Sequence, residues 1–150
     1  MSIFPTKVLL ATDGSPDAEL ALTSAVDLAN STNSELHVVT VAPGYPAYDV
    51  RNPVVVEELR QRAQEILEEQ TGKIEQAGGK VAEKYLRVSQ RHRAQEIVEV
   101  AEEIGAGLIV MGSRGLGGMR RALMGSVSDS VVRHAHCPVM VVRHEREQAA

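Results

Sequence analysis

The sequence predicts an α/β fold: a doubly wound, five-stranded parallel sheet with helices on both faces. Five short apolar segments alternate with four segments of helical periodicity, in the order βαβαβαβαβ, and each connection is long enough to hold a helix. Of the 150 residues, 43% are hydrophobic and 24% are charged, an ordinary globular composition that supports one core. Because no repeat or linker interrupts the pattern, residues 1–150 are expected to form one domain.

Composition and charge argue against several classes of function. The net charge of −4 disfavours general nucleic-acid binding, and an aromatic content of 3% without tryptophan disfavours a base-stacking platform. No run of about 18 apolar residues is present that would span a membrane, and the first residues lack a signal-peptide pattern. The single cysteine cannot form a disulfide within the chain, so a reducing, cytoplasmic setting is expected.

The first strand and helix have clear boundaries in the sequence. Residues 7–11 (KVLLA) predict a strand, and Ser15 as N-cap with Pro16 at the first helical position predicts a helix start. The helix is expected to break at residues 30–34, and residues 36–41 (LHVVTV) predict the second strand. The expected inner face of this helix comprises Ala18, Ala21, Leu22, Ala25, Leu28 and Ala29.

A loop over residues 42–52 leads to a long second helix. Asn52 and Pro53 are expected to cap and begin it, and the glycines at 78–79 to end it. Residues 81–88 then predict a third strand, whose more polar composition suits a position near a sheet edge. The expected inner face of the second helix comprises Leu59, Ala63, Ile66, Leu67, Ile74 and Ala77.

The remaining elements surround a glycine-rich loop. A third helix is expected to end at Gly105, and residues 108–111 predict a fourth strand buried on both faces. A fourth helix follows the loop, and Val139–Val142 predicts a last strand at a sheet edge, before a charged tail. The expected inner face of the third helix comprises Ala94, Ile97, Val98, Ala101 and Ile104.

The segment from residue 108 to 127 (LIVMGSRGLGGMRRALMGSV) combines a strand, a glycine-rich loop and a helix start. Ser126 and Asp129 give the S-x-x-D pattern that opens a helix, with the Ser126 hydroxyl expected to cap it or to contact a ligand. Glycines allow close backbone approach, and a helix N-terminus offers unpaired N–H groups to an anion. Arg114, Arg120 and Arg121 add positive charge, so the loop predicts a phosphate site.

The glycine spacing distinguishes among phosphate-binding loops. A Walker A loop would require lysine where Gly118 stands, and the dinucleotide fingerprint G-x-G-x-x-G is not formed. Gly112, Gly115, Gly125 and Ser126 instead give the pattern G-x2-G-x9-G-S. In this spacing the chain resembles the universal stress protein family, specifically its ATP-binding branch, and the resemblance extends over nearly the whole chain.

The resemblance implies a strand order of 3-2-1-4-5 in a Rossmann-like, adenine nucleotide alpha hydrolase-like fold. This order places a switch point between the first and fourth strands, where ligands bind outside the carboxyl ends of the strands. The turn at Asp13 and Gly14 and the loop over residues 112–125 would meet there. The ligand implied by the family is ATP, with Mg²⁺ or Mn²⁺.

The resemblance also assigns expected roles along this crevice. Asp13 would lie at the adenosine end, although by itself it would be read as closing an Asx turn. The backbone of Val41, otherwise a core residue, would meet the adenine edge. The other expected contacts are Ala11 and Thr12 at the adenosine end, Met111 and Gly112 beside the ribose, and Arg114, Gly115, Gly125, Ser126 and Val127 around the phosphates.

The predicted nucleotide site is compatible with two classes of function. The first is a nucleotide-dependent regulator of the stress response that acts through a homodimer, paired through Val139–Val142, or through a partner protein not identified by the sequence. The second is a slow ATP hydrolase or group-transfer enzyme, which is disfavoured because no water-activating residue stands beside the phosphate loop. A stress protein without ligand is disfavoured by the intact glycine pattern.

Two further clusters receive no functional role. His134, His136 and Cys137 lie within four residues, but i and i+2 positions do not share a helix face, so a metal site is not expected. Residues 87–93 (RVSQRHR) are expected to form a solvated turn. Ser89 stands where the family commonly has glycine, which leaves the shape of this part of the rim open.

Overall fold

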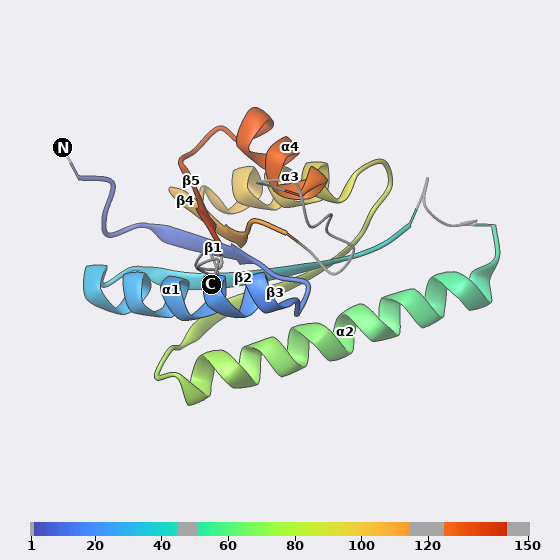
Figure 1. Cartoon of the computed structure of the whole chain (residues 1–150), viewed down its shortest axis with the longest axis horizontal. Helices are drawn as coiled ribbons and strands as arrows, with labels where there is room; N and C mark the ends of the chain where they lie inside the picture. The colour runs from blue at the N-terminus through green and yellow to red at the C-terminus, as the bar shows by residue number, and fades with distance from the viewer. Residues whose placement is uncertain (1, 45–50, 115–124, 144–150) are drawn as a thin grey trace, which may run out of the picture.

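The computed structural model describes residues 2–44, 51–114 and 125–143. It confirms the doubly wound fold: a fully parallel five-stranded sheet in the order β3-β2-β1-β4-β5, between two layers of helices (Figure 1). The expected 3-2-1-4-5 order is therefore confirmed. The strands are β1 (Lys7–Ala11), β2 (Glu35–Ala42), β3 (Val81–Val88), β4 (Leu108–Gly112) and β5 (Val139–Val142).

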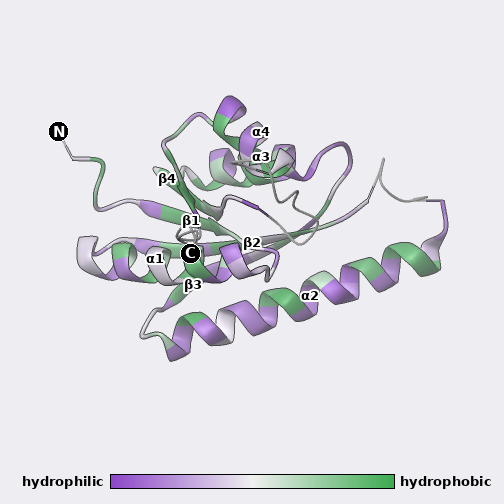
Figure 2. Cartoon of the chain, viewed as in Figure 1, coloured by the Kyte–Doolittle hydropathy of each residue, from purple (hydrophilic) through white to green (hydrophobic). Residues whose placement is uncertain are grey.

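Two helices cover each face of the sheet. Helices α1 (Pro16–Thr32) and α2 (Pro53–Gln76) lie on one face, and α3 (Arg93–Ile104) and α4 (Ser126–His134) lie on the other (Figure 1). A separate hydrophobic cluster fills each interface, because side chains of the central strands alternate between the two faces. Hydrophilic and hydrophobic residues alternate along α2, as expected for a helix with one solvated side (Figure 2).

The predicted helix caps are confirmed for α1 and α2. The Ser15 hydroxyl accepts a hydrogen bond from the Ala18 N–H at 3.3 Å, and the Asn52 side chain accepts one from the Val54 N–H at 3.1 Å. Helix α1 runs further than expected, to Thr32, because Asn33 adopts the left-handed conformation (φ 56°) that ends a helix.

One expected core position in α2 is wrong. Ala77 is exposed and follows the helix as its C-cap, whereas Gln70 is buried on the inner face with Leu67 and Ile74. The helix ends at Gln76, so Ala77 no longer follows the helical spacing that would turn its side chain toward the sheet. A polar side chain therefore occupies a position where the helical pattern alone suggests an apolar one.

Strands β3 and β5 form the two edges of the sheet. The edge position of β3 explains its exposed polar residues, as expected. Strand β5 pairs with β4 on one side, and Met140 at its centre remains 38% exposed. None of the helices in the described part of the chain combines the length and hydrophobicity needed to cross a bilayer.

Candidate functional site

A cleft of about 790 Å³ lies at the carboxyl ends of the strands. Its floor is formed by the ends of β1 and β2, and its walls by α2 on one side and the N-terminal turns of α3 and α4 on the other. The turn after β1 and the start of α4 both border the cleft, so it lies beside the switch point between β1 and β4. Ligands in doubly wound folds bind at this position.

One wall of the cleft is apolar. The lining side chains of this wall are Val41, Pro43, Leu59, Ala63 and Ile66. Three of them come from residues 59–66 of α2, where the sequence pattern assigned them to the core. Leu59 and Ile66 are half-buried, and the start of α2 extends past the strand ends (Figure 1). This wall provides an apolar surface that suits the face of a planar base.

The charged residues of the cleft are mainly cationic. Three arginines line it: Arg62 from α2, Arg91 from the β3–α3 connection and Arg93 at the start of α3. They stand against one carboxylate, Asp13, among the described lining residues. This excess contrasts with the net charge of −4 for the whole chain. Such a lining attracts an anionic ligand.

These arginines form no ion pair within the described part of the chain, although acids lie near them in sequence. Arg62 has glutamates at i−4 and i+3 on the same helix face, and neither pairs with it. Close to Arg93, the Glu96 carboxylate instead accepts a hydrogen bond from the Gln90 N–H at 3.3 Å. The guanidinium groups are therefore available to a ligand in the cleft.

The β1–α1 turn brings Asp13 to the cleft. The Asp13 carboxylate accepts a hydrogen bond from the Ser15 N–H at 3.0 Å, and Gly14 at φ 76° allows the sharp turn. The Asx turn is therefore present. The same side chain is half-buried and lines the cleft, so the turn-forming role and a ligand-binding role are compatible.

The two ends of the glycine-rich loop are fixed by a buried carboxylate and a buried hydroxyl. Asp17, which is 3% exposed, accepts hydrogen bonds from the Ser113 hydroxyl at 2.6 Å and from the Arg114 N–H at 3.1 Å. The Ser128 hydroxyl donates to the Ser113 carbonyl oxygen at 2.7 Å, and the Gly125 N–H donates to that oxygen too. No local sequence pattern indicates this function of Asp17, since its partner Ser113 lies 96 residues away.

Helix α4 begins one residue earlier than the S-x-x-D pattern indicated. Gly125 is the N-cap, in an extended conformation, and its carbonyl oxygen accepts the first helical hydrogen bond, from the Asp129 N–H. Ser126 is the first helical residue and is exposed in the cleft lining. The expected capping role of the Ser126 hydroxyl is therefore wrong, because that role belongs to the preceding residue.

Gly112 has a packing function. A Cβ at this position would lie 2.7 Å from the backbone carbonyl carbon of Asp17, closer than real Cβ contacts allow. The end of β4 therefore packs directly against the first turn of α1, and this contact requires glycine.

Only some of the expected site residues come together in the cleft. Asp13, Val41, Ser126 and Val127 line it. Ala11, Thr12, Met111, Gly112, Arg114 and Gly125 lie in the segments beside it, with Ala11, Thr12 and Met111 buried. Gly115, together with Arg120 and Arg121, lies outside the described residues.

Several lining residues were not anticipated from the sequence. Arg91 and Arg93 belong to the stretch expected to form a solvated turn. They are exposed as expected, and they also border the cleft. Ser89, which stands in place of a glycine, is buried at 4% exposure and lines the same wall. These residues border the cleft because α3 packs on the opposite face of the sheet from α2. Sequence periodicity does not show on which face a helix packs.

Comparison with known proteins identifies the family. Residues 5–143 match the model of the universal stress protein family. The chain belongs to this family. A universal stress protein of Methanocaldococcus jannaschii is 36% identical over 147 residues, which cover 95% of this chain and 84% of the relative. The family resemblance drawn from the glycine spacing is therefore confirmed.

Solved structures of universal stress proteins share the fold. The structure of hypothetical protein MJ0577 superposes with a TM-score of 0.81 at 27% identity, covering 96% of this chain and 99% of that one. A universal stress protein in complex with cAMP gives a TM-score of 0.69 at 27% identity, with coverages of 95% and 99%. The Archaeoglobus fulgidus protein in complex with dAMP gives 0.68 at 26%, with coverages of 91% and 96%.

Proposed function

We propose that this universal stress protein binds ATP in the switch-point cleft and acts as a nucleotide-dependent regulator in the cytoplasm. The observation that carries the proposal is the joining of an apolar wall to a cationic rim in one cleft of about 790 Å³. An apolar surface suits a planar base and cationic side chains suit phosphates, so the combination favours a nucleotide. Mg²⁺ or Mn²⁺ would enter with the triphosphate.

The placement of the ligand follows from the elements around the cleft. The adenine would lie against the α2 wall near Val41, and Asp13 would accept a hydrogen bond from a ribose hydroxyl. The phosphates would lie toward the start of α4. Its N-cap, Gly125, has no side chain to cap the first N–H groups of the helix, so these can donate to a phosphate. The binding of cAMP and dAMP by two proteins of the same fold supports an adenine nucleotide as the ligand.

The second candidate is a slow ATP hydrolase or group-transfer enzyme using the same cleft. Asp13 is the one carboxylate among the described lining residues, and it already accepts the Ser15 N–H bond. We favour the regulator because a carboxylate at the nucleoside end is poorly placed to activate water at the γ-phosphate. Measuring ADP release under single-turnover conditions separates the two candidates.

Native mass spectrometry of the purified protein tests the ligand class directly. A mass increment equal to ATP, with or without one divalent ion, supports the proposal. An increment equal to AMP would leave the cleft as a nucleotide site and would overturn the choice of ATP. An increment equal to a flavin nucleotide would overturn the adenine assignment of the α2 wall.

Asp13→Ala is expected to weaken Mg-ATP binding by about 1.5–3 kcal/mol, the value of a hydrogen bond to a charged group. Loss of the turn bond to Ser15 should cost only about 0.5–1.5 kcal/mol of stability, so the protein should fold. Calorimetric titration measures the affinity. The matched control is Asp13→Asn, which keeps an acceptor for the turn. An unchanged affinity in the alanine variant would leave Asp13 with its turn-forming role alone.

We further propose a homodimer paired through the edge strand β5. Val139–Val142 presents apolar side chains and one unpaired edge, and Met140 is 38% exposed. Val141→Lys should shift the protein from dimer to monomer, because it places a charge in the pairing strand. Light scattering at micromolar concentration measures the shift. The control Val54→Lys changes a valine that is 63% exposed on α2 and should not alter assembly. A monomeric wild type would refute the dimer.

A further inference from the structure

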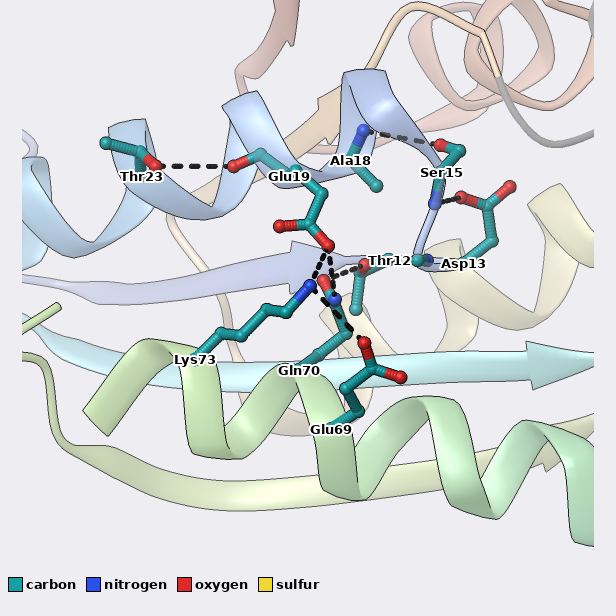
Figure 3. A network of polar contacts seen from close by, with 10 residues as sticks. Thr12, Asp13, Ser15, Ala18, Glu19, Thr23, Glu69, Gln70 and Lys73 are labelled. Carbon is teal, nitrogen blue, oxygen red and sulfur yellow. Dashed lines mark hydrogen bonds and ion pairs between the residues drawn. The ribbon is translucent and has the colours of Figure 1, made fainter. Parts of the chain in front are cut away.

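A chain of polar contacts joins the β1–α1 turn to the C-terminal part of α2 (Figure 3). The Gly14 N–H donates to the Thr12 hydroxyl oxygen at 3.2 Å, and the Thr12 hydroxyl donates to Gln70 Oε1 at 2.7 Å. Gln70 Nε2 in turn donates to Glu19 Oε1 at 3.3 Å, and the Lys73 ammonium group donates to the same oxygen. The contacts span three elements: the turn that carries Asp13, helix α1 and helix α2.

The direction of each hydrogen bond in this chain is determined from its charged end. Lys73 can only donate, and the ionised Glu19 carboxylate can only accept. The Gln70 amide must therefore turn its NH₂ group toward Glu19 and its oxygen toward Thr12. The Thr12 hydroxyl then donates to Gln70, which leaves its oxygen lone pairs to accept the Gly14 N–H.

Packing alone does not explain a glutamine at position 70. It is 1% exposed and lies between Leu67 and Ile74 on the face of α2 that packs against the sheet. A buried amide costs free energy unless its polar atoms are paired, so a leucine would serve packing at this position better. The amide oxygen is paired with Thr12 and the amide nitrogen with Glu19, and the first of these partners belongs to the turn beside the cleft.

We propose that Gln70 is a positioning residue for nucleotide binding: by holding the Thr12 hydroxyl, it sets the Thr12–Asp13–Gly14 turn in its ligand-binding conformation. The inference rests on the proposed function, because Asp13 is the ligand contact that the turn carries. Gln70 itself does not line the cleft. Its action on the ligand passes through Thr12 and the backbone of Gly14.

The network also couples α2 to the occupancy of the cleft. Residues 59–66 of α2 form the apolar wall, whereas Gln70 and Lys73, nearer its C-terminus, hold the turn on the floor. A ligand that contacts both the wall and Asp13 therefore binds one arrangement of α2 relative to the turn. Helix α2 is accordingly the element whose position responds to the nucleotide.

An exchange of side chains within the network tests the proposal. Gln70→Glu places a second carboxylate beside Glu19, so the two repel and the Thr12 bond is disrupted; ATP affinity should fall about tenfold, as for loss of one buried hydrogen bond. Glu19→Gln keeps an acceptor for Lys73 and for Gln70, and its affinity should stay close to that of wild type. The double variant Glu19→Gln with Gln70→Glu restores the pairing with donor and acceptor exchanged. In that variant the amide at position 19 donates to the carboxylate at position 70, so the pair between the two positions is restored. The double variant should therefore recover the lost ATP affinity.

The matched control is Gln64→Glu on the same helix. Gln64 Nε2 donates to Glu68 Oε1 at 2.8 Å, so the same change of amide to carboxylate beside a glutamate occurs on the solvated face. This variant should bind ATP as wild type does. Affinities are measured well below each variant's Tm, so that a purely structural Gln70 would lower Tm while leaving the affinity unchanged. That outcome, or a double variant that fails to recover, would overturn the proposal.

A double-mutant cycle with Asp13→Ala locates the effect. If Gln70 acts through the turn, Gln70→Glu should weaken ATP binding far less in the Asp13→Ala background than in wild type. Additive losses would overturn the proposed route. If wild type binds no ATP, the proposed function fails separately, and amide exchange at Gly14 still decides the positioning role. Exchange at Gly14 should be faster in Gln70→Glu and return to the wild-type rate in the double variant.

Discussion

Gly125→Asp is expected to abolish ATP binding while leaving the fold intact. Gly125 is the N-cap of α4, with φ −72° and ψ 166°, a conformation that any residue adopts. Aspartate is a preferred N-cap residue, so the apo variant should be at least as stable as wild type, by a few tenths of a kcal/mol. The same carboxylate would stand at the helix N-terminus proposed to face the phosphates, where it would repel the ligand and occupy its hydrogen-bond donors.

Thermal unfolding with and without Mg-ATP measures this prediction. Wild type should gain about 2.7 kcal/mol at a ligand concentration one hundred times Kd, and the aspartate variant should gain nothing. Gly125→Asn is the matched control, since it offers a similar cap without the charge and should retain part of the binding. An aspartate variant that ATP stabilises as strongly as wild type would show that the phosphates lie elsewhere.

Gly112→Ala and Gly72→Ala are expected to change stability in opposite directions. At Gly112 the new Cβ would lie 2.7–2.8 Å from backbone atoms of Asp17 and Ala18, so β4 or α1 must shift, at a cost of about 1–3 kcal/mol. Gly72 lies within α2 with nothing within 4 Å of the added Cβ. There alanine should stabilise the protein by about 0.5–1 kcal/mol, because glycine loses more backbone entropy in a helix.

Chemical denaturation of the two alanine variants measures these changes as free energies of unfolding. The contact at Gly112 also borders the Asp17 bonds that fix the start of the glycine-rich loop, so Gly112→Ala should weaken ATP binding as well. Gly72→Ala should leave the affinity unchanged. A neutral Gly112→Ala would mean that β4 and α1 can separate without loss, which would remove the packing role assigned to this glycine.

The helix and strand pattern of this protein could be predicted from its sequence because that pattern is local. The alternating periodicities and the Ser15 and Asn52 caps reflect contacts within a few residues, and each agreed with the structure. The polar composition of β3 also agreed with its edge position. The strand order came from the family resemblance, since periodicity does not report which strands are neighbours. The start of α4 was wrong by one residue, because two residues in succession, Gly125 and Ser126, can each act as a helix cap.

The sequence by itself determined the elements, the family and the glycine spacing beside the switch point. Only the tertiary structure decided which residues wall the cleft and which polar groups support it. Leu59 and Ile66 have the spacing of core residues, and the packing of α2 against the sheet places both in the cleft lining. Asp17 and Gln70 are buried polar residues whose partners lie 96 and 58 residues away. Such pairings depend on how the layers pack against the sheet, which no local pattern encodes.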